Sequence, residues 1–315
     1  MGFFASLINS MPSAVAQGLI WGIMAIGVYL TYRILDVADL TVDGSLGTGG
    51  AVCVVMVLNG APVGLALLAA TAAGMLAGLV TGLFHTACGI PAILAGILTQ
   101  LALYSVNLRI MGFGTGGGKA NLPISVDKYG LLVSARYVRN VALNNPILIL
   151  TIFCAVLIAV LYWFFGTELG CSLRATGANQ NMARAQGINT NVTKVLGLMI
   201  SNGLVALAGG LLAQYQGFSD INMGRGAIVI GLAAVIIGEV IFSRIFRNFA
   251  LKLLSAVIGA IIYYIVMVFV LRLGLSTDDL KLLTALVVAL FLTIPYWKSK
   301  YFTKTSVKKG EKNHA

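Results

Sequence analysis

Long runs of apolar residues alternate with short polar segments along almost the whole chain. Most runs extend for about 20 residues, the length that a helix needs to cross the ~30 Å hydrocarbon core of a bilayer. The pattern predicts an all-α polytopic membrane protein with about nine transmembrane helices, in a range of about eight to ten. The expected spans cover residues 14–31, 44–58, 62–84, 90–110, 146–165, 195–215, 227–242, 251–271 and 280–295.

Composition agrees with this class and limits the partners. The chain is 59% hydrophobic and 10% charged, whereas soluble domains average about 45–50% and about 25%. Its formal charge of +11 comes from basic residues at the predicted membrane edges and in the tail, and no folded soluble unit carries a basic patch. Acidic membrane lipids therefore explain the charge better than nucleic acid does.

The distribution of lysine and arginine sets the expected orientation, because positively charged loops favour the cytoplasmic side. Three basic clusters, at 174–194, at 244–252 and in the tail, fall on one side of a nine-span arrangement, with the N-terminus outside and the C-terminus inside. The basic residues of the long loop after the fourth span run against this rule. The expected organisation is a single transmembrane domain at 1–296, with a cytoplasmic loop at 169–194, an external loop at 112–145, and a basic cytoplasmic tail at 297–315.

Glycine-rich segments interrupt two of the expected helices. The second span is predicted to be discontinuous and to begin near Gly44. The segment 39–52, DLTVDGSLGTGGAV, is similar to the segment 220–235, DINMGRGAIVIGLAAV, and five spans separate them, which would make the second an inverted copy of the first. Many transporters build a central pathway from such inverted repeats with broken helices. Chance similarity between segments rich in glycine and alanine is the alternative.

Several polar side chains lie on or beside apolar spans. An unpaired polar group in hydrocarbon costs several kcal/mol, so each must face a partner or a wet cavity. The candidates for a translocation pathway are Asp39, Thr41, Asp43, Ser45, Asn202, Gln214 and Gln216. Glu239 is expected either to anchor the structure by pairing with Arg244 or Arg247, or to contact substrate. His85 is read as a solvated or packing residue, with a proton carrier as the alternative.

No motif supports a catalytic, nucleotide or metal site in this chain. The stretch GFGTGGGKA at 112–120 does not fit a phosphate-binding loop, since Phe113 stands at the first glycine position and Ala120 replaces the required Ser or Thr. The four cysteines form no CxxC pair, and neither HExxH nor GxSxG occurs. We therefore expect no enzyme activity and no cofactor bound by this chain.

The polar segment between the fifth and sixth spans has helical character. Gly177, Ala178 and Asn179 can start a short helix, and Gly187 followed by Asn189 can stop it. The positive charge of the segment favours the cytoplasmic side. An ordinary solvated connector is the alternative interpretation.

Two motifs resemble a known family. The pattern L-R-A-x-G-x-N-x-x-x-A-x-x-x-G-I at 173–188 resembles the ATPase-facing loop of ABC importer permeases of the branched-chain amino acid and ribose type. The stretch ADLTVDGS at 38–45 resembles the I-D-L-S-V-G-S segment of ribose-type permeases. Together the likeness covers about 14–295, and the segment 201–239 looks most like permeases assigned to tryptophan and tyrosine uptake.

This resemblance implies a permease subunit that imports a small solute across a bacterial inner membrane. The loop would be the coupling helix that sits in a groove of the ATP-hydrolysing subunit, which would hold ATP and magnesium. A second copy of the chain, an extracytoplasmic solute-binding protein and membrane lipids would complete the assembly. The residues expected at the ATPase contact are Arg174, Asn179, Arg184 and Gln186.

The resemblance favours an amino acid, of aromatic type, as the solute. A ribose-type or nucleoside-type ABC permease stays open as an alternative. A transporter of another class is the third possibility, in which Asp39, Asp43 or Glu239 would carry a proton or sodium ion and no ATPase would be required.

Overall fold

The computed structural model describes residues 3–113, 117–126, 128–138, 145–242, 246, 248–272 and isolated positions between 282 and 293. Two short strands, β1 (Asn121–Pro123) and β2 (Phe218–Asp220), accompany a bundle of helices. A π-helical turn (Leu30–Ile34) continues the first helix, and a 3-10 turn covers Ala135–Tyr137. The α-helices are α1 (Phe3–Tyr29), α2 (Val42–Leu58), α3 (Val63–Thr86), α4 (Ala92–Met111), α5 (Pro146–Gly166), α6 (Glu168–Ala178), α7 (Gln180–Ala185), α8 (Thr190–Gln216), α9 (Ala227–Phe242) and α10 (Phe249–Arg272).

Two long apolar helices form the centre of the bundle. In the most apolar 18-residue stretch of each helix, the buried share is 89% in the first helix and 72% in α8. The same share is only 33% in α3 and 22% in α4 and in α5. The outer helices therefore expose apolar side chains, as lipid-facing helices do, whereas α1 and α8 hold the core. In the described part of the chain, six helices are long and apolar enough to cross a membrane, which confirms a polytopic membrane protein.

Small residues let α3 approach α8 closely. A Cβ atom at Gly74 would overlap the backbone carbonyl oxygen of Asn202, and one at Gly78 would overlap that of Leu198. Close backbone contact of this kind is the usual way in which membrane helices associate, since lipid offers no hydrophobic drive between them. The glycines consequently fix the part of α8 that carries Asn202.

Two apolar helices are shorter than a bilayer crossing. At 1.5 Å per residue, α2 with 17 residues and α9 with 16 are about 25 Å long, below the ~30 Å hydrocarbon core. The second expected span begins at Val42, close to the predicted start near Gly44, but its glycine-rich stretch is helical throughout, so the expected discontinuity within it is not observed. The connector 35–41 that precedes α2 lies outside any helix.

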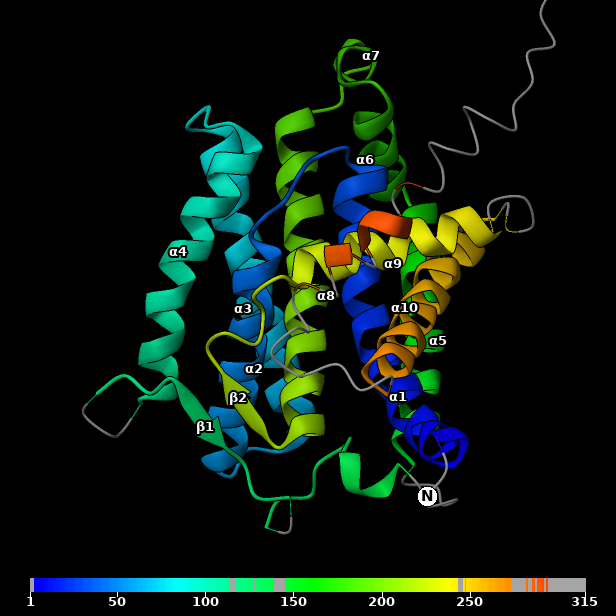
Figure 1. The fold of residues 1–315 in the computed structure, drawn as a ribbon. Coiled ribbons are helices and arrows are strands. Elements are labelled where there is room, and N and C mark those ends of the chain that lie inside the picture. Colours follow the sequence, from blue (N-terminus) through cyan, green and yellow to red (C-terminus); the bar gives the residue numbers. More distant parts are fainter. Residues whose placement is uncertain are drawn as a thin grey trace, which may run out of the picture.

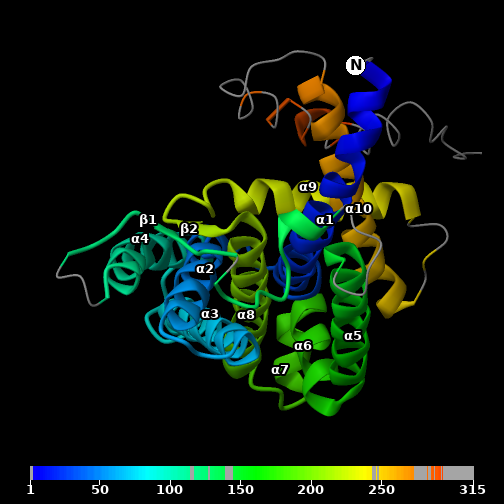
Figure 2. The ribbon, with the colours of Figure 1, turned by 90° about the horizontal axis from the view of Figure 1, so that it is seen from below.

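The seventh expected span, 227–242, has the predicted bounds but is too short to cross a bilayer by itself. Figures 1 and 2 show that α9 runs at a large angle to α8. The count of about nine spans is not confirmed, and the ninth, at 280–295, falls mostly outside the described residues. The non-helical segment 218–226 precedes α9 as the connector 35–41 precedes α2, and we call each of these short helices, together with the segment before it, a broken element.

Different elements lie at the two ends of the bundle. Helix α7 projects from one end, and the two strands and the start of α1 lie toward the other (Figure 1). β1 pairs with β2 in antiparallel register, Leu122 opposite Ser219, which joins the long loop 112–145 to the segment after α8. Both segments were predicted on the external side, and the structure places them together. Which end faces the cytoplasm is still a prediction from charge.

Candidate functional site

The segment between α5 and α8 folds into two consecutive short helices. Asn179 has an extended backbone, with φ −160° and ψ 104°, and this break separates α6 from α7. Its side-chain oxygen accepts hydrogen bonds from the backbone N–H groups of Asn181 and Met182, both at 3.1 Å, as an N-cap does. Gly187 ends the second helix with φ +81°. The short helix expected to start at 177–179 and to stop at Gly187 is present as α7, but Gly177 and Ala178 belong to the end of α6.

Three contacts attach this segment, residues 168–187, to the bundle; we name it the coupling segment after the role predicted for it. The hydroxyl oxygens of Thr176 and Thr193 lie 2.9 Å apart, and Arg184 donates from Nε to the Thr190 hydroxyl at 2.8 Å. Gly177 lies directly against the backbone carbonyl of Ile34, where a Cβ atom would overlap the oxygen. The segment is therefore an anchored structure and not a loose connector.

The residues predicted at the ATPase contact have different positions in this segment. Asn179 caps α7, Arg184 bonds to Thr190, and Gln186 is exposed after the last turn of α7. Arg174 lies farther back, on α6, beside a cavity described below. Their contact with an ATPase stays a prediction. Met182 is exposed by 64% at the projecting end. It is not among the predicted residues, which are all polar.

A buried polar network joins the connector 35–41 to α2 and α8. Asn202 donates from Nδ2 to the Asp39 carboxylate at 2.7 Å and accepts from the Ser45 hydroxyl at 2.6 Å. The other Asp39 oxygen accepts from the backbone N–H of Thr41 at 2.9 Å. All four side chains are buried. Asp39 accepts both of these hydrogen bonds, one on each carboxylate oxygen.

A line of threonines extends this network toward α3 and α4. The Thr41 hydroxyl lies 2.8 Å from that of Thr81, which donates to Thr99 at 2.9 Å. Four of the predicted pathway residues therefore gather in one cluster with little or no exposed surface. In a single copy of the chain they hold helices together, and their place along a pathway stays a prediction.

The other three pathway candidates lie apart from this cluster. The Asp43 carboxylate accepts from the backbone N–H groups of Gly226 at 2.9 Å and Ile228 at 3.0 Å, so the first turn of α2 caps the start of α9. The two broken elements meet at this carboxylate. Gln214 is buried and accepts from the backbone N–H of Leu132 at 3.2 Å, while Gln216 is exposed.

Glu239 takes part in an ion pair. Its carboxylate accepts from Nε of Arg33 at 2.9 Å, a structural pairing of the kind expected with a partner that was not predicted. Arg244 and Arg247 lie outside the described residues. The pairing was not visible in the sequence because 206 positions separate the two residues. His85 lies with Nδ1 2.9 Å from the Ile90 carbonyl oxygen, in agreement with a packing role.

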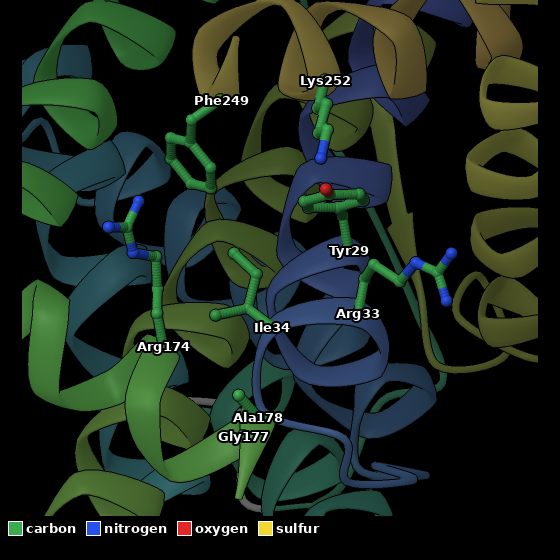
Figure 3. Close-up of a pocket in the computed structure, with 8 residues that line it drawn as sticks. All are labelled: Tyr29, Arg33, Ile34, Arg174, Gly177, Ala178, Phe249 and Lys252. Carbon is green, nitrogen blue, oxygen red and sulfur yellow. The ribbon is translucent and has the colours of Figure 1, made fainter. Parts of the chain in front are cut away.

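Two open cavities lie beside these elements. One of about 350 Å³ is enclosed near the coupling segment by α1 with its π-helical turn, α6 and α10 (Figure 3). Another of about 570 Å³ lies between α1, α9 and α10, where aliphatic and aromatic side chains surround Gln17 and Arg225. Within the described ranges, no three His, Cys, Asp or Glu side chains gather as metal ligands would.

Comparison with known proteins identifies relatives over nearly the whole chain. The family described as branched-chain amino acid transport system permease component matches residues 10–294. The tyrosine transport system permease protein of Clostridioides difficile is 41% identical over 284 residues, covering 90% of each chain. An uncharacterized protein of Rickettsia prowazekii is 37% identical over 90% of this chain and 97% of its own.

A more distant relative transports a sugar. The ribose import permease protein RbsC of Escherichia coli is 28% identical over 73% of this chain and 69% of its own length. The relatives and the apolar helices together indicate a multi-pass protein of the inner membrane.

Proposed function

The chain belongs to the branched-chain amino acid transport system permease family, and from this premise we propose that it is the membrane-spanning subunit of an ABC importer for an amino acid. The single observation that carries the proposal is the 41% identity with a tyrosine transport permease over 90% of both chains. The chain would form the solute path, and a separate ATPase subunit would hydrolyse ATP.

The coupling segment has the geometry that docking to an ATPase requires. It projects from one end of the bundle, its tip carries the exposed Met182 and Gln186, and its base is fixed to α8 by the two threonine contacts. In this proposal Met182 supplies the apolar centre of the contact and the polar residues beside it supply the rim. We infer that α7 enters a groove of the ATPase.

Movement of this segment has a direct route to the interior. Gly177 touches the Ile34 backbone at the start of the connector, and Leu173 packs with Leu35 over Gly197. Four residues after Leu35, Asp39 is bound to Asn202. A shift of α6 would therefore displace the connector and, through it, the start of α2. Packed elements with two discrete arrangements transmit such shifts.

The cavity of about 570 Å³ supports an amino acid with an apolar side chain as the solute. Tyr264 and Met267 supply an apolar wall, and the Arg225 guanidinium is suited to a carboxylate. Gly226, whose N–H Asp43 binds, also lines this cavity, so a predicted pathway residue lies at its edge. An external binding protein would deliver the solute, and two permease copies would face two ATPase sites.

The ATPase contact is tested with Met182→Asp, because this side chain is 64% exposed. We expect co-purification with the ATPase encoded beside this chain to fall at least tenfold, about 1.4 kcal/mol, while the unfolding temperature stays unchanged. Phe113→Asp is the matched control, since Phe113 is 77% exposed and lies far from α7. Unchanged co-purification of the Met182 variant, or solute accumulation on an ion gradient without any ATPase, would contradict the proposal.

The solute is tested by uptake in vesicles that contain the whole transporter. We expect tyrosine, tryptophan or phenylalanine to compete for uptake and ribose not to compete. Arg225→Gln should raise the half-saturating solute concentration about tenfold, the loss of a charge-assisted bond. Competition by ribose alone would replace the amino acid with a sugar and leave the ATPase coupling standing.

A further inference from the structure

The cavity beside the coupling segment has no role in the proposed solute path. It lies at the α7 end of the bundle, whereas Arg225 and the other cavity lie beside the element that follows β2. Three separate elements enclose its volume of about 350 Å³. Its walls are formed by Tyr29, Arg33, Ile34, Arg174, Gly177, Ala178, Phe249 and Lys252.

Two cations of this cavity have no carboxylate partner in the described part of the chain. Among the residues that the structure describes, Arg174 and Lys252 form no ion pair, whereas Arg33 is bound to Glu239 at 2.9 Å. Figure 3 shows the Arg174 guanidinium and the Lys252 ammonium on different sides of the cavity, and the Arg33 guanidinium turned away from it. The uncompensated positive charge in a concave site favours an anion.

The walls indicate what kind of anion fits. A guanidinium binds phosphate through two parallel hydrogen bonds, and an ammonium adds a second point of charge. Beside these cations, Phe249 and Ile34 provide apolar surface. Basic pockets between transmembrane helices on the cytoplasmic side commonly hold acidic lipid headgroups. A phosphate with an attached acyl group suits this combination better than a small hydrophilic anion does.

We propose that the cavity binds the phosphate group of an acidic phospholipid of the inner leaflet, held between Arg174 on α6 and Lys252 on α10. The bound lipid would tie the base of the coupling segment to α10, which packs against α1 and α9. The inference depends on the α7 end being cytoplasmic but does not depend on ATPase docking.

The experiment measures lipid binding to the purified, delipidated chain by native mass spectrometry and by thermal unfolding. Phosphatidylglycerol, phosphatidylcholine and inorganic phosphate are added separately. We expect phosphatidylglycerol to bind at least tenfold more tightly than phosphatidylcholine and to raise the unfolding temperature. Saturation by inorganic phosphate alone, with no preference for phosphatidylglycerol, would overturn the lipid as the source of the phosphate.

Variants with opposite expected signs separate this site from general charge effects. Arg174→Gln and Lys252→Gln should each weaken phosphatidylglycerol binding about tenfold. Glu239→Gln removes the charge that balances Arg33 and should strengthen it two- to threefold. Lys119→Gln, an equal loss of charge at an exposed external position, should leave binding unchanged. Equal binding by all four variants, or weaker binding by the Glu239 variant, would refute the site, and neither result depends on whether an ATPase binds.

Discussion

The coupling segment and the Asp39–Asn202 network hold polar residues in opposite ways. In the coupling segment, the exposed Asn179 uses its side chain to cap α7, and water can replace a cap bond that breaks. In the network, Asp39 and Asn202 are buried and bonded to each other at 2.7 Å, so a lost bond has no substitute. Substitutions in the interior should therefore lower the free energy of unfolding, whereas substitutions in the coupling segment should weaken coupling to the ATPase.

The largest effect is expected in the interior. Asn202→Ala removes the donor to the Asp39 carboxyl group and the acceptor of the Ser45 hydroxyl, leaving two buried polar groups short of a partner. We expect a loss of about 3 kcal/mol in the free energy of unfolding, measured by denaturant unfolding in detergent. Asn59→Ala, at an exposed position after α2, is the control. Equal stability of the two variants would remove the distinction between interior and surface.

The second largest effect is expected at the contact between the coupling segment and the connector 35–41, where a substitution should reduce coupling to the ATPase. Gly177→Ala places a methyl group on the Ile34 carbonyl oxygen and must push α6 away from the connector. We expect solute-stimulated ATP hydrolysis to fall about tenfold, about 1.4 kcal/mol, with the ATPase still bound. Gly166→Ala is the matched control because its Cβ would meet nothing within 4 Å. Full stimulation in the Gly177 variant would show that movement does not pass through this contact.

A smaller effect is expected where the two broken elements meet. Asp43→Asn leaves one acceptor oxygen for the two N–H groups of Gly226 and Ile228 that the carboxylate now binds. We expect a loss of about 1 kcal/mol, typical of a weakened helix cap, together with slower uptake. Asp36→Asn, an exposed position with φ +53° that Asn tolerates, serves as the comparison. Equal uptake in both variants would leave Asp43 without a special role.

The smallest change in stability is expected at the ion pair near the surface. Glu239→Gln breaks the contact with Arg33, whose side chain is 58% exposed. Exposed ion pairs contribute about 0–1 kcal/mol, so the unfolding free energy should change by less than about 1 kcal/mol. A loss as large as that of the Asn202 variant would mean that this pair belongs to the interior class.

Much of the architecture could be predicted because hydrophobic runs and turn residues act locally. The runs predicted most helices to within a few residues, and Asn179 and Gly187 marked the two ends of α7 through their own backbone preferences. The helix 227–242 has the predicted bounds, but its crossing of the membrane is not confirmed, because its composition suits a span while its 16 residues are too few for one. Hydropathy reports burial from water and not the direction of a helix, so it did not reveal that α9 lies across the bundle.

The hydrogen-bond partners of the buried polar residues could not be predicted from the sequence. The sequence indicated that Asp39, Asn202 and Glu239 needed partners, because hydrocarbon cannot satisfy them. It did not indicate that Asn202 would bind Asp39, 163 positions away, or that Arg33 would bind Glu239. Gly177 gave a weak signal, since a glycine within a short helix often marks a close backbone approach, but its partner at Ile34 came from another helix.

The sequence by itself determined that this chain is a helical membrane protein of the importer permease family, with a projecting polar segment between two spans. Those properties depend on composition and local order, which every copy of the chain carries before it folds. The tertiary structure alone decided that Asp43 of α2 binds the start of α9, that α6 packs on the connector, and that Arg174 and Lys252 share a cavity. These contacts depend on where whole helices pack, which no short stretch of sequence specifies.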